Sequence, residues 1–262
     1  IKNDAVVFED NGLTDERLRE IEHIHIIGCG SALHAGMVGK RVIEAMCRIR
    51  CTAEVASEFR YENPIIGKKD MCIVISQSGE TADTLAAMRL AKQAGAFTIA
   101  IVNVVSSTIA READGVLYTW AGPEISVATT KAYSAQLSAL YLISVKIARV
   151  RGLISIGDER ALCAELQRLP ECIEQTLKCQ SDMQRIATLY ANRSSVFFLG
   201  RGLDYAAALE ASLKLKEISY IHSEAYAAGE LKHGTISLIE EGTLVVALAT
   251  QPALFEKTVS NI

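Results

Sequence analysis

One stretch of this chain decides its fold: MCIVISQSGET, residues 71–81. Its first five residues are an apolar run of strand length, and a short polar loop follows directly. A helical pattern comes next, with Leu85, Met88 and Ala91 spaced for one face and Gly95 placed to end it. A buried strand that leads through a polar loop into a helix is typical of an α/β protein with a parallel sheet.

The loop at residues 76–81 has the chemistry of an anion site. A helix N-terminus leaves backbone N–H groups without partners and carries a partial positive charge, and Gly79 lets that backbone come close to a ligand. No lysine or arginine lies in the loop, which suits a small phosphate ester better than a magnesium nucleotide. On this segment alone, an ordinary capped turn is an equally good interpretation. Four side chains add hydrogen-bond donors: those of Ser76, Gln77, Ser78 and Thr81.

The composition excludes several classes of protein. Half of the 262 residues are hydrophobic and 6% are aromatic, as expected for a large aliphatic core. A net charge of −4 argues against a general nucleic-acid surface, and no apolar run is long enough to cross a membrane. The seven cysteines form no CxxC pair, so we expect reduced thiols and a cytoplasmic location. The five histidines lack HxxxH or HExxH spacing, so we expect no metal and no cofactor.

Strands and helices alternate along the first 150 residues. This order predicts βαβ units and a doubly wound parallel sheet. The expected strands cover residues 24–27, 52–56, 71–75, 97–102 and 116–120, with helices over 33–46 and 129–150.

An internal duplication follows. Residues 158–192 are charged and helical in period, and Pro170 is placed to open a second helix there. Residues 196–202 then repeat the apolar-strand-then-GxG design of residues 24–30, displaced by 172 positions (200 against 28). A helix over 204–219 and a strand over 244–249 are expected next.

The second copy differs from the first. The sequence TQPA, residues 250–253, stands where the phosphate loop should be, and the chain ends at Ile262 before the copy is complete. We therefore expect three parts: a first domain over 1–157, a helical connector over 158–194, and an incomplete second domain over 195–262. Because the chain starts at Ile1 and stops early, we expect a fragment at both ends.

Two other motifs have competing interpretations. Gly28 and Gly30 follow a strand as in dinucleotide folds, but Leu33 takes the third glycine position, so NAD binding is disfavoured. Cys29 has no evident partner histidine for a nucleophilic role.

A row of charges, Glu210-x-x-x-Lys214-x-x-Glu217, lies on one helix face. By spacing alone it is most simply a solvated stripe. Its helix follows Gly200–Gly202, at the sheet edge where α/β proteins bind ligands, and a loop-like run over 224–234 contains His233, which could serve sugar-ring chemistry.

Together these residues resemble the sugar isomerase (SIS) family, nearly from end to end. Within it, the chain is similar to the isomerase region of the glutamine–fructose-6-phosphate aminotransferases, or glucosamine-6-phosphate synthases. The resemblance rests on GCGS (28–31), EVASEFRY (54–61), SQSGETADT (76–84), residues 124–131, LGRG (199–202), LKLKEISYI (213–221) and EAYAAGELKHG (224–234).

The resemblance implies two tandem SIS-type α/β/α three-layer units with parallel sheets, the second one truncated. It implies conversion of fructose 6-phosphate and glutamine-derived ammonia to glucosamine 6-phosphate, in hexosamine biosynthesis. Glu217 would move a proton between C1 and C2, Lys214 would support proton transfer, and His233 of a neighbouring subunit in a homodimer would assist ring opening. The phosphate would be bound by Ser76, Gln77, Ser78 and Thr81, and the sugar would be lined by Cys29, Gly30, Ser31, Ala32, Val127 and Thr129.

The chain departs from the family pattern at two positions. The turn reads Cys29-Gly30-Ser31-Ala32 where CGTS is common, so Ala32 could contribute only its backbone. Thr129 replaces a serine and keeps the hydroxyl.

The family's glutaminase domain and its C-terminal tail, whose lysine forms a Schiff base with the sugar, are absent from this sequence. We therefore expect no turnover by the chain alone. The alternative is a non-catalytic sugar-phosphate sensor with the same fold. A sensor needs the loop but not Glu217 together with His233, and because both are present the enzyme is favoured.

Overall fold

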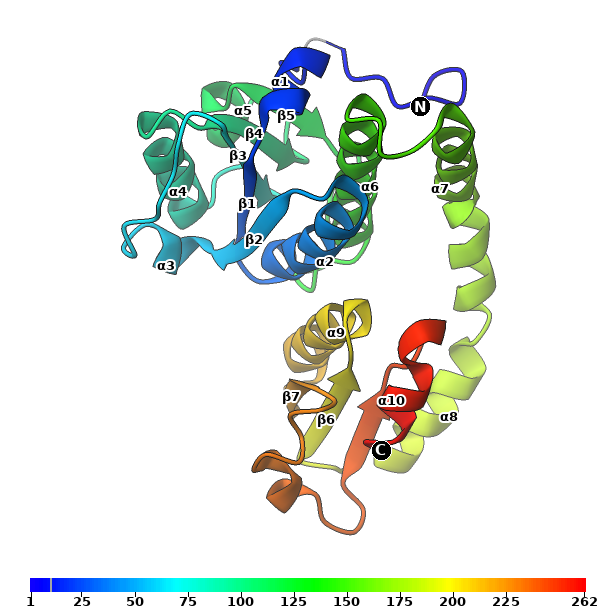
Figure 1. Cartoon of the computed structure of the whole chain (residues 1–262). Helices are drawn as coiled ribbons and strands as arrows, with labels where there is room; N and C mark the ends of the chain where they lie inside the picture. The colour runs from blue at the N-terminus through cyan, green and yellow to red at the C-terminus, as the bar shows by residue number, and fades with distance from the viewer. Residues whose placement is uncertain (10) are drawn as a thin grey trace. The chain divides into compact units, whose positions relative to one another are not determined.

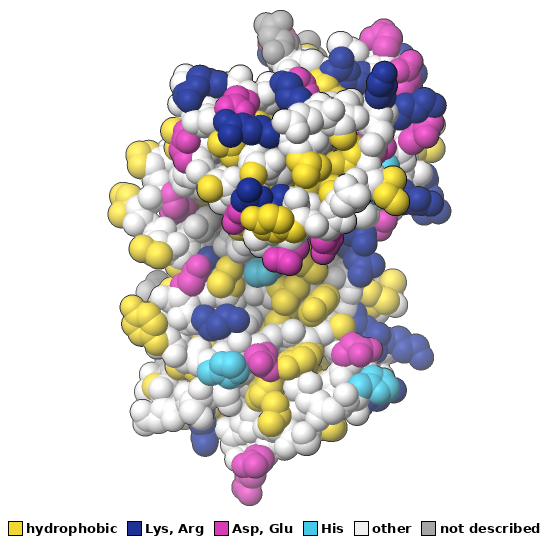
Figure 2. Space-filling view, turned by 90° about the vertical axis from the view of Figure 1, so that its left-hand side faces the viewer, with side chains coloured by type: hydrophobic (Ala, Val, Ile, Leu, Met, Phe, Trp, Pro, Cys, Tyr) yellow, Lys and Arg dark blue, Asp and Glu magenta, His cyan; other side chains and the backbone are white. Residues whose placement is uncertain are grey.

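The fold is seen in a computed structural model that describes residues 1–9 and 11–262 (Figure 1). The chain divides into two units, residues 1–166 and 167–262, and each has its own parallel sheet. Within the described residues, no helix has the length and apolar character needed to cross a membrane. On the face drawn in Figure 2, acidic and basic side chains are interspersed, with no large basic patch.

The first sheet has the strand order β2-β1-β3-β4-β5, and every neighbouring pair is parallel. The central strands are buried on both faces, which is why they read as nearly continuous apolar runs. The strands are β1 (His23–Gly28), β2 (Arg50–Val55), β3 (Asp70–Ser76), β4 (Phe97–Val102) and β5 (Gly115–Tyr118).

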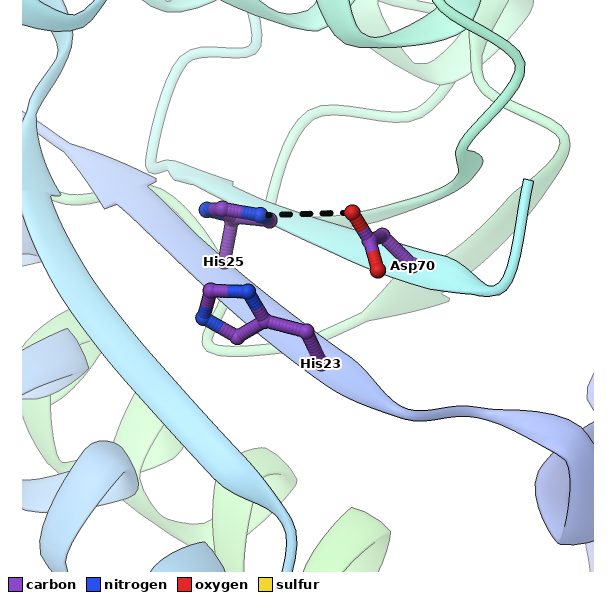
Figure 3. Close-up of side chains that lie close together, drawn as sticks. All are labelled: His23, His25 and Asp70. Atoms are coloured by element: carbon purple, nitrogen blue, oxygen red, sulfur yellow. Dashed lines mark ion pairs between the residues drawn. The ribbon is translucent and has the colours of Figure 1, made fainter. Parts of the chain in front are cut away.

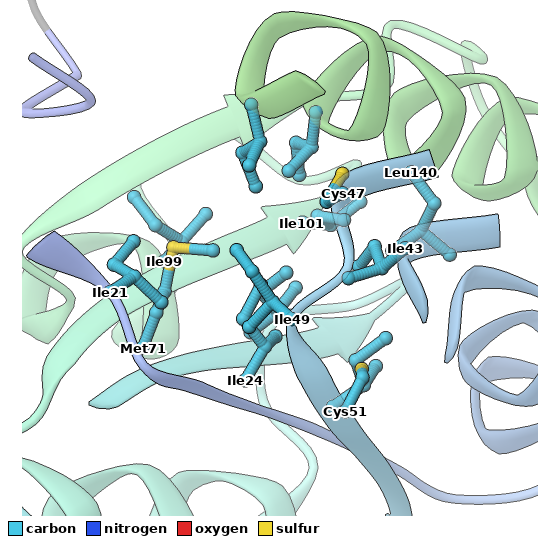
Figure 4. Packing of buried hydrophobic residues seen from close by; sticks show 14 of the residues in the cluster. Ile21, Ile24, Ile43, Cys47, Ile49, Cys51, Met71, Ile99, Ile101 and Leu140 are labelled. Atoms are coloured by element: carbon cyan, nitrogen blue, oxygen red, sulfur yellow. The ribbon is translucent and has the colours of Figure 1, made fainter. Parts of the chain in front are cut away.

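Helices cover both faces of this sheet, so the expected three-layer arrangement is confirmed for the first unit (Figure 1). On one face, α2 and α6 pack over alternate strand residues such as Ile24 and Ile99 (Figure 4). On the other face, α3, α4 and α5 pack over residues such as Ile27 and Val74. The helices of this unit are α1 (Asp15–Glu20), α2 (Ser31–Cys47), α3 (Ala56–Phe59), α4 (Ala82–Gln93), α5 (Thr108–Glu112) and α6 (Lys131–Val150).

The expectation that Pro170 opens a helix is wrong. The helix α7 (Ile156–Leu177) runs through Pro170 and ends seven residues later, and α8 (Gln180–Tyr190) follows a short turn. Proline inside a helix removes one backbone hydrogen bond and crowds the preceding turn. The carbonyl group that loses its donor belongs to Leu166, which is half-buried, and the residues around the proline, 167–171, are exposed.

The second unit repeats the first as far as it extends. Its sheet has the order β7-β6-β8, and α9 starts and ends 172 residues after α2 (203 against 31, 219 against 47). The capping glycines share one conformation, with φ of 55° at Gly30 and 58° at Gly202. The duplication is therefore confirmed. The elements are β6 (Ser195–Gly200), α9 (Leu203–Ser219), β7 (His222–Ala227), η1 (Thr235–Leu238), β8 (Leu244–Ala247), η2 (Pro252–Leu254) and α10 (Phe255–Val259).

The run over residues 224–234 is only partly a loop. Residues 224–227 belong to β7, the counterpart of β2, and pair in parallel with β6. Sequence reasoning missed this strand because its residues, HSEAYA, are mostly polar or small, and because most of the strand is only half-buried.

Candidate functional site

The first sheet has a switch point between β1 and β3. From β1 the chain goes to β2 on one side, whereas β3 leads to β4 on the other side. In open parallel sheets, ligands bind at the carboxyl ends of the two strands that flank such a point. The turns that follow β1 and β3 contain Gly28-Cys29-Gly30 and residues 76–81, so both predicted segments lie at this edge.

The loop over 76–81 is organised by the hydroxyl of Ser76. This side chain is buried, accepts a hydrogen bond from the Gly79 N–H at 3.0 Å, and lies 2.9 Å from the Thr81 hydroxyl. Thr81 is the N-cap of α4 but makes no side-chain capping bond, so its hydroxyl does not close off the N–H groups of the first turn. Gln77, Ser78 and Thr81 are all half-buried and can reach a ligand.

Gly79 is the one position in the loop that only glycine can occupy without strain. Its φ is +67°, and an added Cβ would lie 2.5 Å from the Cβ of Ser107 and closer still to its hydroxyl. The Gly79 carbonyl also accepts a bond from the Ile109 N–H at 3.0 Å. The Gly79 carbonyl therefore ties the loop to the start of α5, and the Gly79 N–H ties it to Ser76 within the loop.

The turn after β1 reaches the same helix terminus. Gly28 packs against the backbone of Ala32 and Leu33, where a Cβ would be 3.0 Å from either. The sulfur of Cys29 lies 3.9 Å from the hydroxyl of Thr84, in the first turn of α4. The structure thus brings Cys29 beside α4, which follows the loop over 76–81, and Gly30, Ser31 and Ala32 begin α2 at the same edge.

Val127 and Thr129 lie in the segment between β5 and α6. Because β5 is parallel to its neighbours, this segment also leaves from the carboxyl edge. Thr129 adopts a left-handed conformation with φ of 43°, which is uncommon for a β-branched residue, and Val127 is 92% exposed. Glu124 fixes the segment by accepting the Ala132 N–H at 3.1 Å, close to the N-terminus of α6.

The charges around the loop are already paired. Asp83, in the first turn of α4, accepts a bond from Arg60 at 2.9 Å. Glu80 points away to the N-terminus of α5, where the Thr108 N–H donates to it and lowers the pKa of its carboxyl. Sequence reasoning did not single out Arg60, although it lies in the EVASEFRY stretch, residues 54–61. Arg60 offsets the one carboxylate that would repel an anion at this helix end.

In the second unit, Lys214 bridges two carboxylates on α9. Its ammonium nitrogen lies 2.5 Å from Glu217 and 3.4 Å from Glu210. Glu210 is 5% exposed, so the interpretation of this row as a solvated stripe is wrong for this residue, whereas Glu217 is exposed. The Lys214 ammonium group is held between the two carboxylates.

The direction of α9 takes Lys214 and Glu217 away from the carboxyl edge of the second sheet, where the sequence analysis placed their helix. The helix begins beside Gly202, at the carboxyl edge of its sheet, and runs to Ser219, just before β7 starts at the opposite edge. Glu217 is 15 residues beyond Gly202, which is about 22 Å at 1.5 Å per residue. Lys214 and Glu217 therefore do not lie at the ligand-binding edge of their own sheet. His233 is exposed in the turns after β7, where its backbone N–H donates to the backbone carbonyl of Glu230 at 3.0 Å.

The loop after β8 is closed by the second unit itself. Asp204 accepts hydrogen bonds from both the backbone and the hydroxyl of Thr250, and Gln251 donates to the Arg201 carbonyl at 2.6 Å. Asp204 corresponds to Ala32 in the first unit, because α9 follows α2 by 172 residues. A carboxylate of the chain thus occupies the place that the first unit leaves open.

A large surface cavity lies elsewhere. It has a volume of about 920 Å³ and is bordered by residues such as Arg17, Lys68, Asp70 and Lys92. Asp70 and Phe97 begin β3 and β4, so this cavity is at the amino edge of the first sheet, opposite the loop over 76–81.

Comparison with known proteins finds a family model and curated relatives that match this chain. A family model, the SIS domain, matches residues 17–146 and 189–261. The glutamine–fructose-6-phosphate aminotransferase (isomerizing) of Caldanaerobacter subterraneus subsp. tengcongensis is 57% identical, over 100% of this chain and 43% of that protein. The aminotransferase of the same name from Thermus thermophilus is 46% identical, over 93% of this chain and 40% of that protein. The chain therefore spans less than half the length of these curated relatives.

A solved structure is similar to this chain over its whole length. The C-terminal domain of glucosamine–fructose-6-phosphate aminotransferase from Francisella tularensis has a TM-score of 0.96 to this chain at 37% identity. The match covers 100% of this chain and 73% of that one.

Proposed function

The chain belongs to the SIS domain family, and from this we propose that it is the isomerase part of an enzyme that converts fructose 6-phosphate and ammonia to glucosamine 6-phosphate. One observation carries the proposal: the first unit has an open loop of neutral donors at its switch point, whereas the second unit fills the same place with Asp204. We therefore assign one sugar phosphate to each chain, on the first unit. Glutamine-derived ammonia would come from a glutaminase domain in a longer protein, since the relatives extend well beyond this region.

The loop supplies binding and orientation. The phosphate would lie at the N-terminus of α4, where backbone N–H groups and the side chains of Gln77, Ser78 and Thr81 can donate to it. Ser76 would act mainly by holding the loop, because its hydroxyl already contacts Gly79 and Thr81. Cys29, beside Thr84, together with Gly30, Ser31, Ala32, Val127 and Thr129, would border the sugar.

Isomerisation needs a base that removes a proton from C1 of the ketose imine and returns it to C2. Glu217 is the carboxylate that we assign to this step. Lys214, 2.5 Å away, would hold it in one orientation, and His233 would assist ring opening. Since α9 takes Glu217 away from the carboxyl edge of its own sheet, this base would not act on a ligand bound at that edge.

The proposal is tested by Glu217→Gln in the longer protein that contains this chain. The variant should bind fructose 6-phosphate normally in calorimetry and form no glucosamine 6-phosphate. Glu241→Gln, at an exposed glutamate, is the matched control and should keep full activity. Undiminished product formation by Glu217→Gln would refute the assignment.

We also propose that the enzyme is a homodimer in which His233 acts in the neighbouring subunit. Mixing inactive Glu217→Gln and His233→Ala proteins should then restore about a quarter of the wild-type activity, because half of the dimers are mixed and each has one intact site. If mixing the two variants restores no activity, His233 does not act in the neighbouring subunit. A cytoplasmic location is part of the same proposal, and the seven free cysteines support it.

The sensor alternative is less well supported. A sensor would have no use for the Lys214–Glu217 pair, and the named relatives are aminotransferases. Tight sugar-phosphate binding with no turnover in the longer protein would favour it.

A further inference from the structure

A cluster of metal-binding side chains lies at the amino edge of the first sheet. His23 and His25 are two residues apart on β1, so both point to the same face, and Asp70 begins the adjacent strand β3 in register with His23 (Figure 3). The candidate ligand atoms of these three residues lie within 4.8 Å of one another. We propose that His23, His25 and Asp70 form a binding site for a divalent transition metal ion, with Zn²⁺ as the best fit.

The strongest support is a pair of buried nitrogen atoms without hydrogen-bond partners. The Nε2 atoms of both histidines are buried and unsatisfied, and the His25 side chain is only 5% exposed. A buried polar atom without a partner costs about 1–3 kcal/mol. A metal ion would accept both lone pairs and remove that cost.

His25 is already oriented as a ligand. Its Nδ1 lies 3.2 Å from a carboxylate oxygen of Glu54 and 3.2 Å from the hydroxyl of Thr52, so this nitrogen can donate its proton to Glu54. The Nε2 lone pair then faces Asp70, whose carboxylate is 3.7 Å away. A carboxylate that holds the far nitrogen of a ligating histidine is the usual outer contact in zinc proteins.

The surrounding charges suit a cation. Asp70 and Glu54 carry two negative charges near the histidines, against the one positive charge of Arg50, which is paired with His23 in register.

The geometry needs only a small adjustment. Zinc bonds of about 2.0–2.2 Å hold ligand atoms roughly 3.3–3.6 Å apart, so the three atoms would move together by about an ångström. Three protein ligands leave a fourth position for water. Asp70 also borders the surface cavity of about 920 Å³.

This site would stabilise the fold and take no part in sugar chemistry. β1 carries His23 at its start and Gly28 at its end, so the cluster and the phosphate loop lie at opposite edges of the sheet, about 16 Å apart along the strand. A metal here would tie β1 to β3, and the inference is independent of the proposed function.

The test is titration of the metal-free chain with Zn²⁺ and Co²⁺. One Zn²⁺ per chain should remain after dialysis, Co²⁺ should produce visible absorption bands, and the melting temperature should rise with Zn²⁺. His23→Gln and Asp70→Asn should each weaken Zn²⁺ binding at least about tenfold, and Glu54→Gln should weaken it about 10–100-fold. His222→Gln is the matched control, because this histidine also lies near a carboxylate, Glu224 at 3.6 Å, but is exposed.

A second measurement needs no variant. Zn²⁺ should protect His23 and His25 of the unaltered chain from carbethoxylation, mapped by mass spectrometry, and should leave His222 reactive. Absence of stoichiometric Zn²⁺ binding would overturn the proposal. Equal Zn²⁺ affinity in wild type and Asp70→Asn would overturn it as well.

Discussion

Replacing Gly79 with alanine tests whether the loop over 76–81 depends on its backbone geometry. The left-handed conformation at φ +67° costs a non-glycine residue about 1–2 kcal/mol. The new Cβ would also collide with Ser107, so the loop must move. Movement breaks the bonds from Gly79 N–H to Ser76 and from Ile109 N–H to the Gly79 carbonyl, each worth about 0.5–1.5 kcal/mol. The expected loss in unfolding free energy is therefore about 2–5 kcal/mol.

Gly152 is a matched control for this change. Its φ is +70°, but nothing lies within 4 Å of an added Cβ, so Gly152→Ala should cost only the backbone term of about 1–2 kcal/mol. Urea unfolding followed by circular dichroism measures both variants. Gly79→Ala is expected to cost about 1–3 kcal/mol more than Gly152→Ala, and this difference reflects the displaced loop. If the same free energy is needed to return the loop to its binding position, Gly79→Ala should bind fructose 6-phosphate roughly 5–150-fold more weakly in calorimetry, whereas Gly152→Ala should bind normally. Equal destabilisation by the two variants, with unchanged sugar affinity, would refute the reasoning.

Three further predictions concern single side chains. Fructose 6-phosphate should slow alkylation of Cys29, which lies beside the loop, and should leave the exposed Cys172 equally reactive; equal slowing at both would count against the site. Ala32→Asp should abolish sugar-phosphate binding in calorimetry without unfolding the chain, because the second unit accommodates aspartate at the equivalent position. Although burial acts to raise it, the pKa of Asp114 is held below its ordinary value by hydrogen bonds such as that from Lys92. The ionised Asp114 side chain therefore stabilises the folded chain above about pH 4, and this contribution is lost as the pH falls through the lower folded pKa. Asp114→Asn should destabilise the chain in thermal melts at about pH 7 and have no such effect in acid.

Sequence reasoning identified the elements that position the candidate site. Residues 71–75 are apolar on both sides, as a central parallel strand requires, and the loop after them contains the needed hydroxyls and glycine. The repeat of strand, GxG turn and helix also located the second unit correctly, because local pattern and tertiary position agree there.

The errors have physical causes of a different kind. Pro170 has a local preference for helix starts, but the structure tolerates it inside an exposed helix. The charged row on α9 looked solvated because spacing says nothing of burial, and Glu210 is buried. The expectation of no metal is not tested by the structure: it rested on helical spacings, whereas His23 and His25 are spaced for a strand and lie near Asp70 only through sheet register.

The duplication gives the clearest account of why one unit would bind an anion. Both units have the same strand order around the switch point and the same glycine conformation before the helix. They differ at the second helical residue: Ala32 in the first unit has no side chain that can cross the crevice, whereas Asp204 in the second unit crosses it and takes both donors of Thr250. A carboxylate that takes the backbone N–H of Thr250 leaves that donor unavailable to an anion, so the residue at this helical position distinguishes the two units.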